Sequence, residues 1–148
     1  MAVYTYDPSE VAVIVGGAIM QGFADGTFVE VERDEQAYEK VTGADGETSR
    51  AKTNNKSGNI TITLKQTSPS NDILSGIMIA DEADNSGVVP VLIKDRLGNT
   101  VFASSAAWVQ QMPSSAYSKE IEEREWVLDC AKIDAFVAGN DSQEGANI

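Results

Sequence analysis

Residues 58–84 read GNITITLKQTSPSNDILSGIMIADEAD, and this segment decides the fold. In its first part, Ile60, Ile62 and Leu64 alternate with Asn, Thr and Lys residues. Strict alternation is typical of a strand that buries one face, because successive side chains point to opposite sides of a sheet. We therefore expect a half-buried strand over residues 59–65.

A short helix is predicted to follow this strand. Ser68 can accept a hydrogen bond from a free backbone N–H of the next turn, and Pro69 suits the first position of a helix, where its missing N–H is not needed. The apolar pair at 73–74 recurs at 77–78, which is the i, i+4 spacing of one helix face. The sequence thus predicts an amphipathic helix over residues 69–83.

The chain on both sides of this unit predicts mostly further strands. Pro90 places its strand at an edge or a bulge, since proline has no N–H for a ladder. Residues 119–137 predict one or two long strands, although the charged part 119–126 would also suit a helix. We expect a mainly β fold, an antiparallel β-sandwich or barrel of about seven or eight strands with one short flanking α-helix. The other strands are expected at Val11–Val15, Ala18–Phe23, Thr27–Arg33, Tyr38–Thr42 (continuing or pairing with the previous one), Val88–Lys94 and Thr100–Ala107.

The length and charge of the chain limit what it can be. It has 148 residues, of which 11 are basic and 23 acidic, for a net charge of -12. This length suits a single domain, expected over 1–148, that can bury a core. The acidic balance argues against a surface that binds nucleic acid, but not against nucleic acid as something to be repelled.

The sequence offers little catalytic chemistry. It contains no histidine, the commonest general acid–base residue and metal ligand. Its single cysteine, Cys130, lies in an apolar run and is expected to be a small buried residue. Paired carboxylates could in principle serve a glycosidase, but at strand spacing they more often cover a solvated face. We predict no catalytic, cofactor-binding or metal-binding residue and no enzyme activity.

No segment is predicted to anchor the chain in a membrane. No stretch approaches the ~20 apolar residues of a spanning helix. The first residues lack the basic and apolar regions of a signal peptide. We therefore expect synthesis and assembly in a reducing cytoplasm.

Residues 43–58 form a long polar segment between two strands. Such an insertion is often functional or mobile, so it is either a solvated loop or an arm that becomes ordered on a neighbouring subunit. Its basic residues favour docking, because the rest of the chain is acidic. The candidate contact residues are Arg50, Lys52, Asn54, Asn55 and Lys56. Residues 138–148, rich in Gly, Asn and Asp, are predicted to be a flexible C-terminal tail.

Several acidic residues are spaced two apart, as in a strand. Glu30 and Glu32 alternate with Val29 and Val31, which places negative charge on one face of a sheet. In a monomer such a face would only increase solubility. In a closed ring it would line a hole and repel phosphate, so that a polyanion could pass without sticking.

The segments NITITL at 59–64 and SPSNDIL at 68–74 together resemble the strand and helix at the centre of tail tube proteins of long-tailed phages, especially contractile ones. The order of the elements from Val11 to Val137 fits the same family. So do the length, the acidic balance and the long polar loop before the central strand.

This resemblance implies a structural virion protein whose hexameric rings stack into a hollow tube that conducts DNA into the host. It implies that Glu30 and Glu32, and next Glu120 and Glu122, line an acidic lumen, and that 43–58 is an arm between rings. The implied partners are further copies of the chain, sheath, baseplate or initiator and tail terminator proteins, with tape measure protein and DNA passing through the lumen. The implied location is the tail of the virion.

Two alternatives remain open from the sequence. The chain could be the tube subunit of a bacterial contractile injection or secretion system, which shares this fold. It could also be a monomeric β-sandwich binding module, which would need exposed aromatic residues as a platform. Trp108 and Trp126 lie in apolar strands and are predicted to belong to the core, which argues against a binding module.

Overall fold

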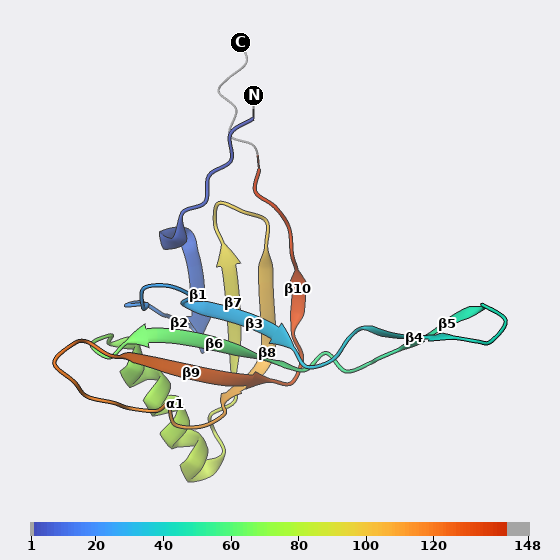
Figure 1. The fold of residues 1–148 in the computed structure, drawn as a ribbon. Coiled ribbons are helices and arrows are strands. Elements are labelled where there is room, and N and C mark those ends of the chain that lie inside the picture. The colour runs from blue at the N-terminus through green and yellow to red at the C-terminus, as the bar shows by residue number, and fades with distance from the viewer. Residues whose placement is uncertain (1, 142–148) are drawn as a thin grey trace.

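The computed structural model describes residues 2–141, so Met1 and residues 142–148 lie outside the description. The chain is mainly antiparallel β with one α-helix, as predicted (Figure 1). Its elements are η1 (Pro8–Glu10), β1 (Val11–Val15), β2 (Ala18–Ile19), β3 (Val29–Arg33), β4 (Tyr38–Thr42), β5 (Thr48–Lys52), β6 (Gly58–Lys65), α1 (Ser70–Asp84), β7 (Val89–Asp95), β8 (Val101–Val109), β9 (Glu123–Cys130) and β10 (Asp134–Phe136).

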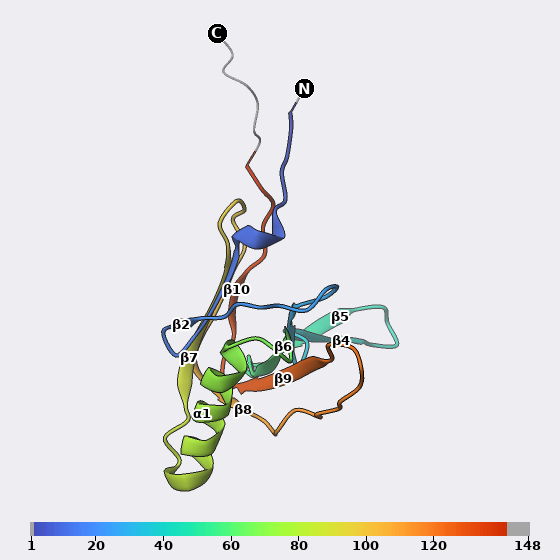
Figure 2. The same cartoon turned by 90° about the vertical axis from the view of Figure 1, so that its left-hand side faces the viewer.

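The main sheet has the strand order β2-β1-β7-β8-β9-β6-β3, and β10 also pairs with β8. The long strand β8 joins two parts of this sheet. Its first residues pair with β7 and β10, and Ala107 to Val109 pair with β9. Figures 1 and 2 show that the β1–β7–β8–β10 part and the β3–β6–β9 part run in crossing directions.

The core lies between the two parts of the sheet and the helix. Ile60, Ile62 and Leu64 of β6 are at most 1% exposed, so the predicted alternation is confirmed. Leu128 of β9 and Val13 of β1 are equally buried. Burial of these side chains stabilises the fold, at roughly 25 cal/mol per Å² of apolar surface removed from water.

The helix begins close to its predicted start. The Ser68 Oγ accepts the N–H of Ser70 at 3.2 Å, as predicted, and Pro69 has helical backbone angles just before Ser70–Asp84. Leu74 is fully buried, whereas Ile73 is 38% exposed and lies off the buried stripe.

Asn71 fastens the start of the helix to the sheet. Its Nδ2 donates to the carbonyls of Lys65 (2.9 Å) and Ser68 (3.1 Å). Its Oδ1 accepts the indole N–H of Trp126 at 2.8 Å. A buried tryptophan needs such a partner, because an unpaired buried donor is costly. The polar contact therefore connects two segments that are far apart in the sequence.

Three predicted boundaries are corrected by the structure. The strand expected over 18–23 is only Ala18–Ile19, after which Phe23 makes a single bridge to Leu64. Residues 43–58 contain a strand, β5, whose partner is β4, so Tyr38–Thr42 neither continues nor pairs with β3. Residues 119–126 are not helical. They are loop up to Glu122 and then strand, because the backbone from Glu123 is paired with β6.

The structure also tests the expectations for Pro90 and for the C-terminal segment. Pro90 lies at a register shift between β7 and β8, so the predicted bulge is confirmed. β7 is not an edge strand, because it pairs with both β1 and β8. Residues 138–141 are bonded to the body: Thr100 Oγ1 donates to the Ala138 carbonyl at 2.8 Å and accepts the Ala138 N–H at 3.0 Å. The rest of the predicted flexible tail, 142–148, lies outside the described residues.

Candidate functional site

One side of the β3–β6–β9 region is covered by carboxylates. Antiparallel pairing places Glu32 opposite Asn59 and Asn59 opposite Asp129. Directly paired residues point to the same side of a sheet, and every second residue along each strand joins them. We call this side the acidic face. Its carboxylates are Glu30, Glu32, Glu123, Glu125 and Asp129.

The acidic face carries little compensating positive charge. Lys65, opposite Glu123, is the one basic residue among the paired positions of this face. The uncharged positions in the middle of the face are Asn59, Thr61 and Thr63 of β6. Because its opposite side is the apolar core, the face is rigidly supported from behind.

The structure separates the four acidic residues that the sequence grouped together. Glu30 and Glu32 lie on β3 and belong to the acidic face. Glu120 and Glu122 lie in the loop before β9, at residues 110–122, and not on a strand as expected. The β9 carboxylates on the acidic face are instead Glu123 and Glu125, because the register places them opposite Lys65 and Thr63 of β6.

Both strands that border the acidic face have an edge with no paired strand in the described part of the chain. There, β3 is paired on one side only, with β6. β9 is paired with β6 along its whole length, and on its outer side Leu128–Cys130 pair with β8. The Val127 carbonyl accepts the Gln110 N–H at 2.9 Å, and residues 111–114 line a hollow with Glu125 and Val127. Within residues 2–141, the backbone of Glu123–Glu125 thus has no strand on its outer side. Such edges are templates for pairing with another chain.

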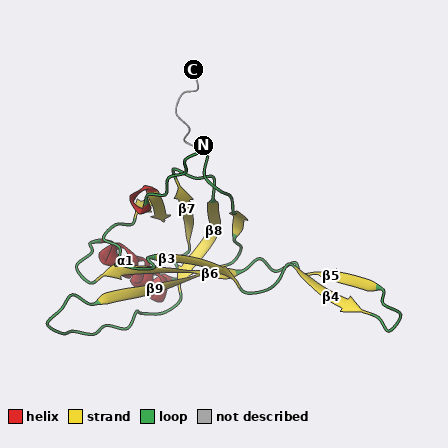
Figure 3. Ribbon diagram, turned by 45° about the horizontal axis from the view of Figure 1, so that its top comes forward, coloured by secondary structure: helices red, strands yellow, loops and turns green. Residues whose placement is uncertain are grey.

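The hairpin β4–β5 projects from the body at the end of β3 and β6 (Figure 3). Every residue in both strands is exposed, and in the described chain these strands pair only with each other. We call this hairpin, residues 38–52, the arm. An isolated two-stranded hairpin is marginally stable in water, so the arm lacks the support that a core supplies.

The two faces of the arm differ in charge. Lys40 pairs with Arg50, and Tyr38 pairs with Lys52, so these side chains share one side with Thr42 and Thr48. The Arg50 guanidinium lies 4.0 Å from the centre of the Tyr38 ring, a cation–π contact. We call this side the cationic face. The opposite side carries Glu39, Val41, Ser49 and Ala51.

The predicted arm residues divide between the hairpin and its base. Arg50 and Lys52 lie on the cationic face, together with Lys40, which sequence reasoning missed. Asn54, Asn55 and Lys56 follow β5 on the way back to the body. There the Lys56 carbonyl accepts the N–H of Ile133 at 2.8 Å, and Asn55 Oδ1 accepts that of Ser57 at 3.0 Å.

The described residues offer neither a metal-binding cluster nor an exposed thiol. Within residues 2–141, no group of His, Cys, Asp and Glu side chains could hold a metal ion, and no helix is long and apolar enough to cross a membrane. Cys130 is 2% exposed, as predicted, and burial raises the pKa of its thiol, which keeps the thiol protonated and unreactive. An open hollow of about 420 Å³ on the β1–β7–β8 part is lined mainly by apolar groups such as Ile14, Leu92 and Ala103.

The two tryptophans have different environments. Trp126 is 2% exposed and belongs to the core, as predicted. Trp108 is only partly buried, and it pairs with Asp129 at the margin of the acidic face. The alternation of β8 places Ala107 and Val109 in the core, and Trp108 therefore points to the other side.

A family model described as the Bacteriophage PhiTE tail tube protein matches residues 1–138. The chain belongs to this family. The tail tube family is structural, so the protein is a component of the phage tail and not an enzyme.

Individual relatives agree with this assignment. The "Structural protein ORF10" of Pseudomonas phage KPP10 is 29% identical over 144 residues, covering 92% of this chain and 83% of that protein. The tube-terminating cap of the anti-feeding prophage has the same fold, with a TM-score of 0.64, 16% identity, and coverage of 93% of this chain and 95% of the cap. The sheath/tube terminator of the PVC extracellular contractile injection system has a TM-score of 0.57 and 15% identity, and the match covers 91% of this chain and 99% of the terminator. A chain of the PVC sheath–tube complex has a TM-score of 0.54 and 16% identity, and the match covers 91% of this chain and 93% of that chain.

Proposed function

We propose that copies of this chain close into hexameric rings, that the rings stack into a hollow tail tube, and that DNA passes through its lumen. The observation that carries the proposal is the acidic face with a free strand edge on each side. The ring size and the cargo are those expected of a tail tube protein.

The two free edges favour a ring. An edge of β3 that pairs with the β9 edge of the next copy makes a head-to-tail contact, and such contacts close into rings when the rotation permits. The sheet would then continue from copy to copy with the acidic face on one side throughout. Closure also removes edges that would otherwise promote aggregation.

The acidic face suits the wall of a lumen. Phosphate groups of DNA would be repelled by Glu30, Glu32, Glu125 and Asp129, and DNA would slide without binding. The mid-face residues Asn59, Thr61 and Thr63 are polar but uncharged, so they offer no cationic site where phosphate could stick. In this proposal Glu120 and Glu122, which lie in the loop, are not part of the wall.

The arm is the proposed contact between copies in adjacent rings. It is fully exposed, it projects beyond the sheet, and one of its faces is cationic in a chain whose net charge is -12. Opposite charges on different copies would guide the two into register.

The proposed partners follow from the family. They are an initiator or baseplate at one end, a tail terminator at the other, a sheath around the tube if the tail contracts, and a tape measure protein inside. Two structural neighbours are sheath, tube or terminator components of an extracellular contractile injection system, and a third is a tube-terminating cap, which supports partners of this kind. Assembly is proposed to occur in the host cytoplasm.

Negative-stain electron microscopy with light scattering of the purified protein tests the ring. We expect rings or hollow tubes, either from the protein alone or after addition of the tail-initiation complex. A monodisperse monomer in both conditions would contradict the proposal and would favour a binding module.

Charge reversal tests the lumen. We expect the Glu30→Lys/Glu32→Lys phage to form tails of normal length but to eject DNA slowly and plate poorly, because lysines would hold phosphate. The matched control is Asp25→Lys/Glu35→Lys, which makes the same charge change outside the acidic face. Normal ejection by the Glu30→Lys/Glu32→Lys phage would contradict the lumen assignment.

The injection-system alternative rests on one observation: two of the structural neighbours are components of the PVC extracellular contractile injection system. Mass spectrometry of purified particles distinguishes a phage tail tube from an injection-system tube. Detection of this chain in tails of DNA-filled particles supports the phage tube, and its presence only in DNA-free injection particles supports the alternative.

A further inference from the structure

We propose that the cationic face of the arm docks on the loop at residues 110–122 of another copy of this chain. This inference rests on the proposed tube, and it names the receiving surface for the arm. The arm by itself indicates only that a partner is needed, because among the described residues its two strands pair only with each other and every one of their residues is exposed.

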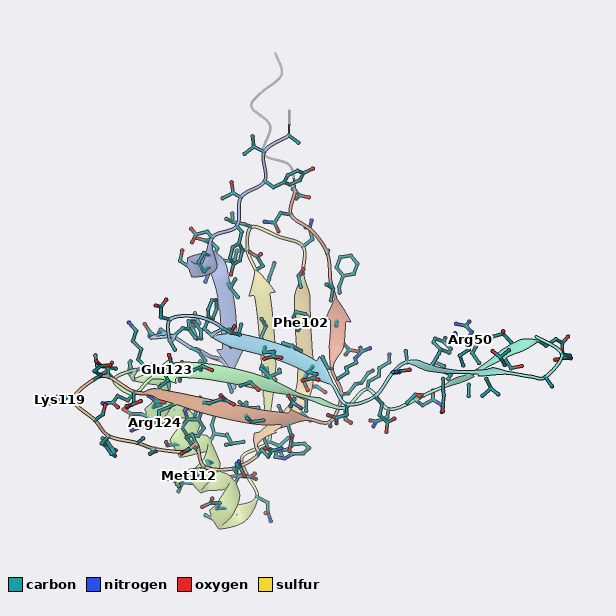
Figure 4. All side chains as sticks on the ribbon, in the orientation of Figure 1. Arg50, Phe102, Met112, Lys119, Glu123 and Arg124 are labelled. Atoms are coloured by element: carbon teal, nitrogen blue, oxygen red, sulfur yellow. The ribbon has the colours of Figure 1, made fainter. Side chains whose placement is uncertain are left out.

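The arm and the loop lie at opposite ends of the molecule. Figure 4 shows Arg50 at one extreme, and Lys119 with Glu123 at the other. The arm continues beyond the Arg33 end of β3 and the Gly58 end of β6, whereas the loop joins β9 at the end where β6 finishes with Lys65. A copy displaced along the strand direction therefore meets the arm of its neighbour with its own loop. One chain cannot make this contact with itself.

The charges of the two surfaces are complementary. Lys40, Arg50 and Lys52 form the cationic face. The end of the loop carries Glu120 and Glu122 beside Lys119, so its net charge is negative. Facing charges of opposite sign fix register and accelerate encounter between copies.

The loop also exposes apolar groups that a partner would cover. Met112, Tyr117 and Ile121 are 67%, 80% and 63% exposed, which is unusual for three large apolar residues in one segment. Tyr38, on the cationic face of the arm, is 41% exposed. Contact between these groups would add burial to the charge pairing, and exposed salt bridges alone contribute little.

The loop keeps a defined shape in which it can receive the arm. Its C-terminal end is held by Gln66, whose N–H donates to the Glu122 carbonyl at 2.9 Å and whose Oε1 accepts the Glu122 N–H at 3.1 Å. Pro113 is buried near its start. The Tyr117 ring lies over the Arg124 guanidinium at 5.5 Å.

The acidic face is the competing receptor for the arm. It carries more carboxylates than the loop, but a cationic arm on it would introduce lysines into the proposed lumen. It also lacks exposed apolar side chains comparable to those of the loop, since its single apolar paired position on β9, Val127, is partly buried. We therefore assign the arm to the loop, and the test includes the acidic face as an outcome.

Carbodiimide cross-linking of purified virions tests the contact without mutation. The reagent joins lysine amines to carboxylates that are in contact, and mass spectrometry locates the links. We expect links from Lys40 or Lys52 to Glu120 or Glu122. Links from these lysines only to Glu30, Glu32 or Asp129, or no link from either lysine in tails that contain the chain, would overturn the inference. Absence of the chain from tails would instead overturn the proposed function.

Charge exchange provides a second test. Lys40→Glu/Arg50→Glu/Lys52→Glu should raise the protein concentration needed for tube assembly by about tenfold, because several weak pairs become repulsive. Addition of Glu120→Lys/Glu122→Lys to this variant should restore assembly. Addition of Glu30→Lys/Glu32→Lys, which changes charge equally, should not. Equal rescue by both pairs, or rescue by the second alone, would overturn the inference.

Discussion

The acidic face and the arm are both charged and both exposed, but they differ in what lies behind them. The acidic face is one side of strands whose other side is the core, with Ile62 and Leu128 fully buried. The arm has solvent on both faces. A surface is therefore rigid when its strands have a core behind them, whatever its charge or exposure. A rigid surface suits a wall, and an unsupported hairpin suits a contact that becomes ordered on docking.

The largest expected effect comes from the support behind the acidic face. Leu128→Ala should lower the free energy of unfolding by about 2–5 kcal/mol, because it leaves a cavity where the side chain is 0% exposed. Val41→Ala on the arm, a matched removal of an exposed apolar group, should change it by less than about 0.5 kcal/mol. Urea denaturation followed by tryptophan fluorescence measures both, and similar values would remove the distinction between the regions.

The second prediction concerns the junction between arm and sheet. A Cβ on Gly58 would lie 2.6 Å from the Ile133 Cδ1 and 2.9 Å from the Arg33 Cα, so Gly58→Ala must push β3 and β6 apart. We expect a loss of about 1–3 kcal/mol in stability, as for other overpacked sites. The control is Gly76→Ala in α1, where an added Cβ meets nothing within 4 Å. The higher helix propensity of alanine should raise the free energy of unfolding of this variant by about 1 kcal/mol. Urea denaturation measures both variants. If the denaturation midpoint of Gly58→Ala equals that of the unchanged protein, the junction between arm and sheet is loosely packed.

The third prediction sharpens the view of the arm as a separate unit. Arg50→Ala removes the cation–π contact with Tyr38, which contributes about 0.5–1 kcal/mol at exposed sites. The loss should appear as faster amide hydrogen exchange within residues 38–52 and not as a change in global unfolding. The control Lys52→Ala should change the exchange rates less. A change in the free energy of global unfolding for either variant would contradict the view of the arm as an independent unit.

The smallest expected effect lies on the acidic face itself. Glu30→Gln/Glu32→Gln removes repulsion between neighbouring carboxylates, and it should raise the free energy of unfolding by up to about 0.5 kcal/mol at low salt. The gain should shrink at high salt, where the repulsion is screened. Denaturation of both proteins at two salt concentrations tests this, and a loss of stability would mean that these carboxylates make favourable contacts.

Local patterns were sufficient for the elements whose signal lies within a few residues. Ile60, Ile62 and Leu64 predicted a half-buried strand, and Ser68 with Pro69 predicted the start of the helix, because alternation and capping depend on neighbouring residues. The arm was recognised as polar, but its second strand was missed. Thr48–Lys52 has no apolar side to produce alternation, and its partner β4 supplies all of its backbone pairing.

The order of amino acids is enough to show that this chain is acidic, mostly β and without histidine, and that it contains a polar segment with several basic residues. Which carboxylates share a face depends on how the strands pair. Glu30 and Glu32 meet Glu125 and Asp129 there, whereas Glu120 and Glu122 do not. The reason is that side chains alternate with a period of two, so a shift of the pairing register by one residue reverses the side to which every side chain of a strand points. That register is set by pairing between β6 and β9, which are far apart in the sequence and carry no local signal of each other.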